Sequence, residues 1–287
     1  MADASPGSAR AVVGAAIAAA VERLDAELPR ARAGHDPEGV HQARVATRRL
    51  RSDLRTFAPM LDEAWRVAMR ADLKVLTDAL GAVRDLDVLR IRLESAIEQL
   101  GIDDAADLLA RLDEHDAAER HRLVTVLDSD ATADLIARLR TATADPPTTA
   151  AAQAAAEDQL RPLARRPWRR LRRAVRSLGQ EPPIAELHRV RLLAKRARYA
   201  AEAVTPAFGR RARRLAKALA GVQDVLGDLN DAEQTIAWLQ EAVDELSPRA
   251  AFAAGLLTAH FEQQATEHRH GWERSFRRAE RRSDWLD

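Results

Sequence analysis

The sequence contains no cysteine among its 287 residues. Disulfide bonds, thiolate nucleophiles and cysteine-ligated zinc are therefore excluded, and the composition fits a reducing compartment such as the cytoplasm. No apolar run approaches the roughly 20 residues that a membrane-spanning helix needs, so we expect no membrane partner. Histidines and carboxylates show no spacing typical of a metal site, and the zinc-binding pattern His-Glu-x-x-His is missing. We therefore expect neither a metal ion nor another cofactor.

Glycine and proline are also scarce, with 12 of each, and aromatic residues make up only 4% of the chain. Helix-breaking residues are thus few, which favours an all-α protein with a core of alanine, leucine and valine. The apolar segment 11–21 weakly resembles a signal-peptide core, but the helical pattern continues to Leu28, so we favour a first amphipathic helix. Turn and helix-start signals predict helices over about 8–33, 38–58, 62–83, 85–100, 103–127, 130–142, 151–178, 184–204, 207–227, 229–245 and 249–280.

Lysine is rare as well, since only Lys74, Lys195 and Lys217 accompany the arginines among 45 basic residues. A GC-rich genome would explain this, and so would a need for planar guanidinium groups that bind phosphate through two hydrogen bonds. Charged residues reach 31% of the chain, yet the formal net charge is only +1. The whole chain is no polycation, so anion binding requires local clusters of basic residues.

Two such clusters carry the same pattern 147 residues apart. The first row is His41, Arg44, Arg48 and Arg51, extended by Arg55, and the second is His188, Arg191, Lys195 and Arg198. The i, i+3, i+7, i+10 spacing places each row along one side of a helix, beside the apolar stripe. Side chains in that position line a groove between helices. The alternative is a solvated row whose arginine stems cover apolar surface.

The rows are expected to cost stability while the groove is empty. Two charges about 8 Å apart repel by roughly 2 kcal/mol at an effective dielectric constant near 20. No acidic residue stands between His41 and Arg51 or between His188 and Arg198 to offset this repulsion. The repetition of the row, led by histidine both times, favours a shared site for a strongly anionic ligand over an ordinary solvated surface.

The repeat also predicts how the chain is organised. We expect one unit over 1–287 with two halves, 1–145 and 150–287, joined near 145–149, where two prolines interrupt the helical pattern. Each half has a basic helix, then a helix ending in Leu-Gly, then an acidic turn. The fold class expected is all-α, with two pseudo-symmetric four-helix bundles about a pseudo-two-fold axis.

The acidic turns carry Asp85 and Asp87 in the first half and Asp228 and Asp231 in the second. Two interpretations are open for these carboxylates. They are either helix N-caps that follow a glycine, or groups that orient the arginine and histidine side chains.

A third basic stretch precedes the second row. Pro162 and Pro167 are expected to kink its start, and Arg166, Arg169 and Arg173 then share one helical face. This face is either another wall of the same groove or a general basic surface.

These motifs resemble a known family. The segment from His41 to Arg51 resembles the first signature of the conserved histidine α-helical domain, called CHAD, and the segment from His188 to Glu202 resembles the second. The turns after Leu80-Gly81 and Leu226-Gly227 match as well, so the resemblance covers nearly the whole chain.

The resemblance implies two four-helix bundles around a basic central groove that binds inorganic polyphosphate, in a family whose members associate with polyphosphate granules. The signature positions in this chain are His41, Arg44, Arg48, Arg49, Arg51, His188, Arg191, Lys195, Arg196, Arg198 and Tyr199. The Glu-x-Glu-x-Lys signature of the triphosphate-tunnel domain, which many members carry, is missing from this sequence.

We therefore expect a protein that binds inorganic polyphosphate without catalysis, in the cytoplasm and at polyphosphate granules. The alternative is a nucleic-acid-binding protein, although no aromatic residues suited to base stacking alternate with the basic rows. If polyphosphate is the ligand, we expect nucleic acid to compete for the same site more weakly. A third hypothesis is a metal-dependent phosphohydrolase, in which Asp85 and Asp87 hold a divalent ion. The sequence predicts neither the oligomeric state nor the ligand length.

Overall fold

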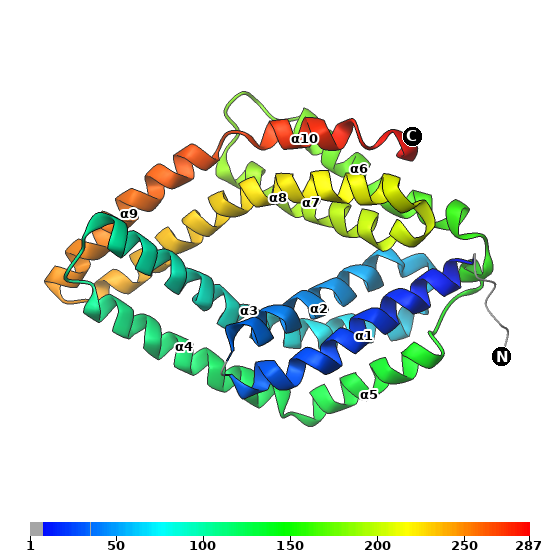
Figure 1. Ribbon diagram of the computed structural model, residues 1–287, viewed down its shortest axis with the longest axis horizontal. Helices are drawn as coiled ribbons and strands as arrows, with labels where there is room; N and C mark the ends of the chain where they lie inside the picture. Colours follow the sequence, from blue (N-terminus) through cyan, green and yellow to red (C-terminus); the bar gives the residue numbers. More distant parts are fainter. Residues whose placement is uncertain (1–7, 35) are drawn as a thin grey trace.

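The computed structural model describes residues 8–34 and 36–287. Within these ranges the chain forms ten α-helices, a few short 3₁₀ turns and no strand, which confirms the all-α class (Figure 1). The helices are α1 (Ala9–Ala33), α2 (Pro37–Thr56), α3 (Glu63–Leu100), α4 (Ala106–Leu127), α5 (Asp130–Ala144), α6 (Ala156–Arg176), α7 (Ile184–Ala203), α8 (Thr205–Ala242), α9 (Pro248–His268) and α10 (Trp272–Glu280).

The order of helix lengths repeats along the chain. The basic helices α2 and α7 have 20 residues each, and the helices that follow them, α3 and α8, span 38 residues each, with a kink in α8 at Gly209, whose φ is 53°. The described residues thus place five helices before the segment 145–155 and five after it, where bundles of four were expected. The division into two halves and their pseudo-two-fold relation stay predictions of this repeat.

The segment 145–149 runs between α5 and α6 and is fixed to the region that follows α2. The Asp62 amide donates to the Pro147 carbonyl at 2.9 Å, and the Thr149 amide donates to the Met60 carbonyl at 2.9 Å. The stretch is therefore held by backbone hydrogen bonds instead of running free.

The expected break after Leu80-Gly81 is wrong, because α3 continues to Leu100. A glycine inside a helix costs about 1 kcal/mol relative to alanine. Burial outweighs that cost here, since Leu80, Val83 and Leu93 are fully buried along the same helix. The expected break after Gly227 is wrong for the same reason, as Leu226 and Leu229 are buried and α8 continues to Ala242.

One further helix prediction needs correction. The segment predicted as one helix over 249–280 is two, because Gly271 takes a left-handed φ of 96° between α9 and α10. α6 is helical across Pro162 and Pro167, so neither proline ends the helix predicted over 151–178, and the kink stays a prediction. The fully buried residues Leu160 and Leu171 hold this helix against its neighbours despite the two missing amide donors.

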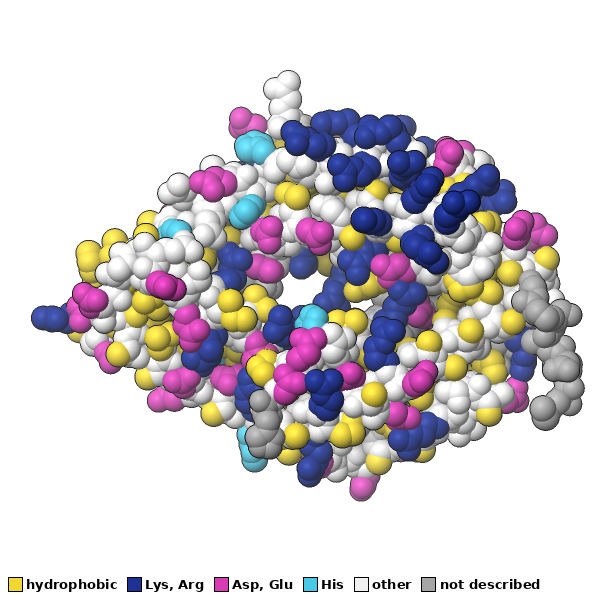
Figure 2. All heavy atoms as spheres, in the orientation of Figure 1, with side chains coloured by type: hydrophobic (Ala, Val, Ile, Leu, Met, Phe, Trp, Pro, Cys, Tyr) yellow, Lys and Arg dark blue, Asp and Glu magenta, His cyan; other side chains and the backbone are white. Residues whose placement is uncertain are grey.

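The buried side chains form two hydrophobic clusters. The larger joins α1, α2, the first part of α3 and α5 to α6, α7, the first part of α8 and α10, so it crosses from the first half to the second. The smaller joins the distal parts of α3 and α8 to α4 and α9, around Leu93, Leu257 and Phe261. Between the two clusters the molecule is open, and Figure 2 shows this opening with lysine and arginine side chains at its rim.

Candidate anion-binding site

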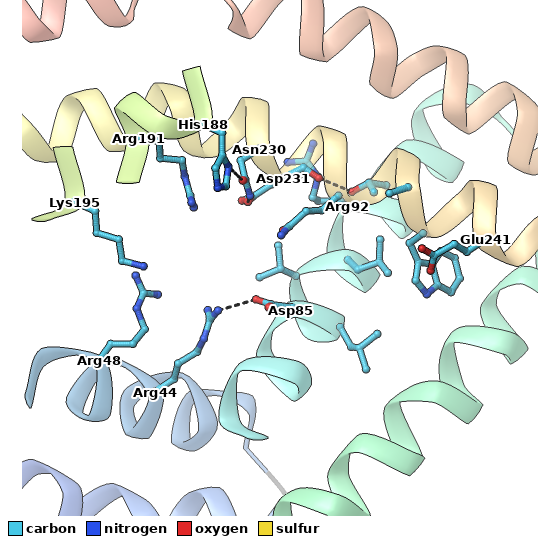
Figure 3. A pocket seen from close by; sticks show the side chains of 17 residues that line it. Arg44, Arg48, Asp85, Arg92, His188, Arg191, Lys195, Asn230, Asp231 and Glu241 are labelled. Carbon is cyan, nitrogen blue, oxygen red and sulfur yellow. Dashed lines mark hydrogen bonds and ion pairs between the residues drawn. The ribbon is translucent and has the colours of Figure 1, made fainter. Parts of the chain in front are cut away.

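The opening contains a cavity of about 480 Å³ whose walls come from α2, α3, α7 and α8 (Figure 3). Its basic lining residues are Arg44, Arg48, Arg92, His188, Arg191 and Lys195. A second cavity of about 150 Å³ adjoins it, lined by Arg48, Arg51, Ser52, Arg55, Arg70, Lys195 and Tyr199. Because Arg48 and Lys195 line both cavities, we treat them as one continuous feature and call it the basic groove.

The two rows reach this groove because the helices that carry them pack against each other. The apolar stripes of α2 and α7, including Leu50 and Ala194, are fully buried, and α2 contacts α7 directly. Each row therefore flanks the contact and faces the opening between the halves. Figure 3 shows Arg44 and Arg48 reaching toward it from α2, and Arg191 and Lys195 from α7.

Three polar contacts hold side chains of the two rows. Arg44 Nη2 donates to Asp85 Oδ1 at 2.9 Å, and Arg48 Nη2 donates to the Tyr199 hydroxyl at 3.3 Å. His188 Nδ1 lies 3.0 Å from the side-chain oxygen of Asn230. The partners of Arg48 and His188 are uncharged, so of these three residues only Arg44 has a carboxylate partner.

Lys195 is the most perturbed group of the groove. Burial, followed by repulsion from Arg48 and Arg191, lowers the pKa of its amine to about 7. It makes no hydrogen bond or ion pair with any residue in the ranges 8–34 and 36–287. At neutral pH a large share of this amine is therefore uncharged in the empty groove.

Several arginines of the rows have lowered pKa values or buried donors without an acceptor among the described residues. Burial lowers the pKa of the Arg44 and Arg55 guanidinium groups. Within the described residues, the buried Nε atoms of Arg44, Arg48, Arg51 and Arg191 have no hydrogen-bond acceptor. An unpaired buried donor costs free energy, so the rows are stabilised by any ligand that supplies negative charge and oxygen acceptors nearby.

Asp85 and Asp231 are the carboxylates that line the larger cavity near the cations. Burial raises the pKa of Asp85, and the nearby charge of Asp231 adds to that rise while Arg44 opposes it. Both residues lie inside helices α3 and α8, so the N-cap interpretation of the acidic motifs is wrong. Their position beside Arg44 and Asn230 agrees with the orienting interpretation.

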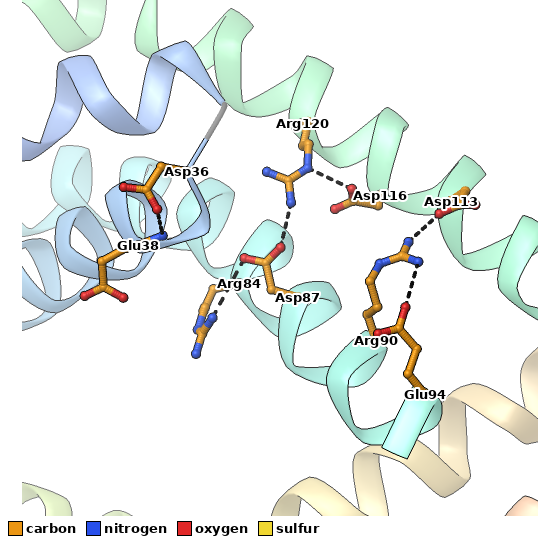
Figure 4. A network of polar contacts seen from close by, with 9 residues as sticks. All are labelled: Asp36, Glu38, Arg84, Asp87, Arg90, Glu94, Asp113, Asp116 and Arg120. Atoms are coloured by element: carbon orange, nitrogen blue, oxygen red, sulfur yellow. Dashed lines mark hydrogen bonds and ion pairs between the residues drawn. The ribbon is translucent and has the colours of Figure 1, made fainter. Parts of the chain in front are cut away.

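The other two acidic residues of these motifs lie elsewhere. Asp87 points toward α4, where Arg120 Nη2 donates to it at 2.6 Å, and Arg84 lies 4.0 Å away (Figure 4). Burial raises the pKa of Asp87. Asp228 is exposed and makes no hydrogen bond or ion pair with the described residues. Asp87 therefore ties α3 to α4 instead of orienting the rows.

Several predicted site residues have structural partners away from the groove. Arg49 Nε donates to Asp53 at 2.9 Å, and Arg49 also pairs with Glu202. Arg198 Nε donates to the same Glu202 at 2.9 Å, and its guanidinium lies 5.3 Å from the Tyr199 ring centre. Glu202 thus binds one arginine from α2 and one from α7, and these cations are neutralised.

The remaining predicted residues line neither cavity. His41 is half-buried at the start of α2, and burial together with the charge of Arg84 lowers its pKa. Arg196 is exposed on α7. Arg166, Arg169 and Arg173 are exposed on α6, outside the groove.

Sequence reasoning missed several lining residues, among them Arg70, Arg92 and Asn230. Arg92 follows Asp85 by seven residues, which is two helical turns and therefore the same face. The helix predicted over 85–100 already contains both residues, so this spacing is a signal that could have found Arg92. In the structure α3 brings Arg92 and Asp85 to the same wall.

Fold and site together define an all-α protein with a groove suited to an extended anion. The protein-family comparison matches residues 15–240 to the CHAD domain, and the chain belongs to this family. The resemblance seen in the two signatures is thereby confirmed, and a polyphosphate-related function follows at the level of the family.

Two solved structures are similar over most of their length. PptA from Streptomyces chartreusis superimposes with a TM-score of 0.77 at 23% identity, covering 93% of this chain and 99% of that one. The CHAD domain from the plant Ricinus communis gives a TM-score of 0.75 at 27% identity, covering 98% and 95%. No curated protein matches the sequence.

Two further features of residues 8–34 and 36–287 concern membranes and metal ions. No helix there combines the length and apolar character needed to cross a membrane. Nor does that part of the chain gather three or more histidine or carboxylate side chains in a group able to hold a metal ion.

Proposed function

We propose that the basic groove binds inorganic polyphosphate and does not cleave it. The observation that carries this proposal is the convergence of Arg48, Arg191 and Lys195, from two distant segments, on one continuous groove. None of the three has a carboxylate partner among the described residues. A linear ligand with a negative charge on every unit matches such a lining. Charge-assisted hydrogen bonds of this kind contribute about 1.5–3 kcal/mol each.

The groove offers little to a nucleic-acid base. Tyr199 lines the smaller cavity, but its hydroxyl accepts from Arg48 and its ring is covered by Arg198. Trp238 lines the other end of the larger cavity. Stacking of successive bases needs a series of accessible aromatic faces. A phosphate polymer without bases therefore fits the lining better than RNA or single-stranded DNA.

Calorimetric titration with long-chain polyphosphate near physiological salt tests the proposal. We expect saturable binding whose affinity falls as salt rises, because each phosphate contact releases condensed counterions, with a slope of about 0.7–0.9 per contact in nucleic acids. RNA added at equal phosphate concentration should displace little of the polymer. Absence of saturable binding, or full displacement by RNA, would remove the proposal.

The noncatalytic part is tested separately. Purified protein incubated with polyphosphate and Mg²⁺ or Mn²⁺ should release no orthophosphate above a protein-free control. Release that disappears when Asp85 and Asp231 are replaced by asparagine would instead identify a metal-dependent phosphohydrolase.

Binding of a polymer also supports a role at polyphosphate granules, where such chains are concentrated. A fluorescent fusion of the chain should colocalise with granules, and a variant with Arg48 and Arg191 replaced by glutamate should not. Equal recruitment of both proteins would show that the groove does not direct localisation.

A further inference from the structure

A second set of unpaired cations lies outside the groove, on α6. Arg166, Arg170 and Arg173 follow an i, i+4, i+7 spacing, which places them on one helical face. All three are exposed, and none makes a hydrogen bond or ion pair with the described residues. We call these three residues the α6 arginine face. Their neighbours differ, since Arg176 pairs with Glu280 at 3.1 Å and Arg165 donates to the Asp287 carbonyl at 3.2 Å.

This face is adjacent to one end of the groove. Arg55, Arg70 and Arg51 line the smaller cavity at that end, and α6 packs against α7, on which Arg196 is exposed. After burial, the charges that act most strongly on Arg55 are all arginines, and Arg196 and Arg170 are among them. Cations therefore continue from the groove across α7 to α6.

The surface around the α6 arginine face is also positively charged. Residues 1–145 carry 20 basic and 26 acidic side chains, a net charge of −6, whereas residues 146–287 carry 25 and 18, a net charge of +7. Figure 2 shows lysine and arginine gathered over the part of the molecule formed by α6, α10 and the first part of α8. Although the net charge of the whole chain is near zero, residues 146–287 are positively charged and attract a polyanion.

The chemistry of this surface selects among polyanions. The large hydrophobic side chains that are exposed in the described residues, such as Val67, Ile91 and Phe252, lie on other helices, and none lies on α6 or α10. Such a surface has no wedge to insert into a membrane and no ring to stack on a base. It suits a chain of phosphates that needs only charge and hydrogen-bond donors.

We propose that a polyphosphate chain too long for the basic groove leaves it between Arg55 and Arg196 and continues along the α6 arginine face. This inference rests on the proposed function of the groove. It assigns preference for long chains to a surface outside the groove, because short oligophosphates fill the groove alone, whereas long chains gain the additional contacts on α6.

The test compares two probes, sodium tripolyphosphate and long-chain sodium polyphosphate, on three folded proteins. The first is the unmodified chain, and the second carries Arg166→Glu, Arg170→Glu and Arg173→Glu. The third is a matched control with Arg274→Glu, Arg278→Glu and Arg281→Glu, which has the same spacing and charge change on exposed positions of α10. Circular dichroism and melting temperature establish that each variant is folded.

We expect the α6 variant to bind the long chain about tenfold more weakly, because three exposed contacts with phosphate are lost, and to bind tripolyphosphate with unchanged affinity. The α10 control should keep most of the affinity for both probes. If both variants lose the same affinity for the long chain, the effect is one of general charge, and the inference is overturned. An unaltered affinity of the α6 variant for the long chain would also overturn it. If neither probe binds the unmodified chain, the proposed function of the groove itself fails.

Discussion

Lys195 shares the lack of a carboxylate partner among the described residues with Arg48 and Arg191, but its amine can lose its proton near neutral pH. Arg44 has Asp85, and Arg198 has Glu202, but Lys195 lines both cavities without a partner. A phosphate polymer would restore the ordinary preference of the amine for its proton. Binding and protonation at this residue should therefore be coupled.

The coupling gives a prediction with a defined sign. The pKa of Lys195 is about 7 in the empty groove, against 10.5 for an ordinary lysine. Between these values the complex holds a proton that the free protein lacks, so polyphosphate affinity should fall with rising pH, by at most about tenfold per pH unit. The unfolded chain also holds that proton, so this residue makes the empty protein more stable as pH rises through the same window.

Calorimetry at about pH 8 in two buffers of different ionisation enthalpy measures the proton directly. We expect uptake approaching one proton by the unmodified protein and none at this site by Lys195→Arg, whose guanidinium stays charged. Equal proton uptake by the two proteins would show that Lys195 is not the coupled group.

His41 and His188, the first residues of the two basic rows, show what the sequence can predict about the site and what it cannot. His41 and His188 are equivalent in the sequence repeat, yet His188 lines the cavity beside Asn230 and His41 lines neither cavity. The rows of arginine could be predicted because helical spacing fixes which side chains share a face. The difference between the histidines could not, because it depends on side chains from other helices.

At the scale of helices, glycine positions decide how closely neighbouring backbones approach. Gly39 at the start of α2 faces α1, and a Cβ atom there would lie 2.8 Å from the Arg30 carbonyl carbon and from its Cβ. Gly227, inside α8, has no atom within 4 Å of the same position. Identical substitutions at these residues should therefore have opposite effects.

We predict that Gly39→Ala lowers the free energy of unfolding by about 1–3 kcal/mol, because a backbone contact must move. Gly227→Ala should raise it by about 0.5–1 kcal/mol through helix propensity. Urea unfolding followed by circular dichroism measures both. Destabilisation of similar size in the two variants would contradict the close approach of α1 and α2.

The helices also show where sequence patterns are insufficient. The periodic apolar positions predicted most helices within a few residues. Gly81 and Gly227 were interpreted as ends, because glycine often follows a helix C-terminus. Long-range burial of Leu80 and Leu226 keeps both helices continuous, and this packing is not visible in a local pattern.

At the scale of the whole molecule, a ring of helices surrounds an opening, and the repulsion between the rows is built into the empty fold. A ligand that binds the folded groove better than the unfolded chain must then stabilise the protein, by about 2.7 kcal/mol at a concentration one hundred times its Kd. For a chain of this size that amounts to several degrees in Tm.

The most direct test of this account is the Tm in the presence of long-chain polyphosphate. Arg48 and Arg191 are the residues to change, because neither has a carboxylate partner among the described residues, and Arg189→Glu on the exposed side of α7 is the matched control. The account predicts a rise in Tm for the unmodified chain and the control, and loss of most of that rise in the double variant Arg48→Glu, Arg191→Glu with its helical content intact. A double variant that keeps the full rise would show that the rows are ordinary surface and that polyphosphate binds elsewhere.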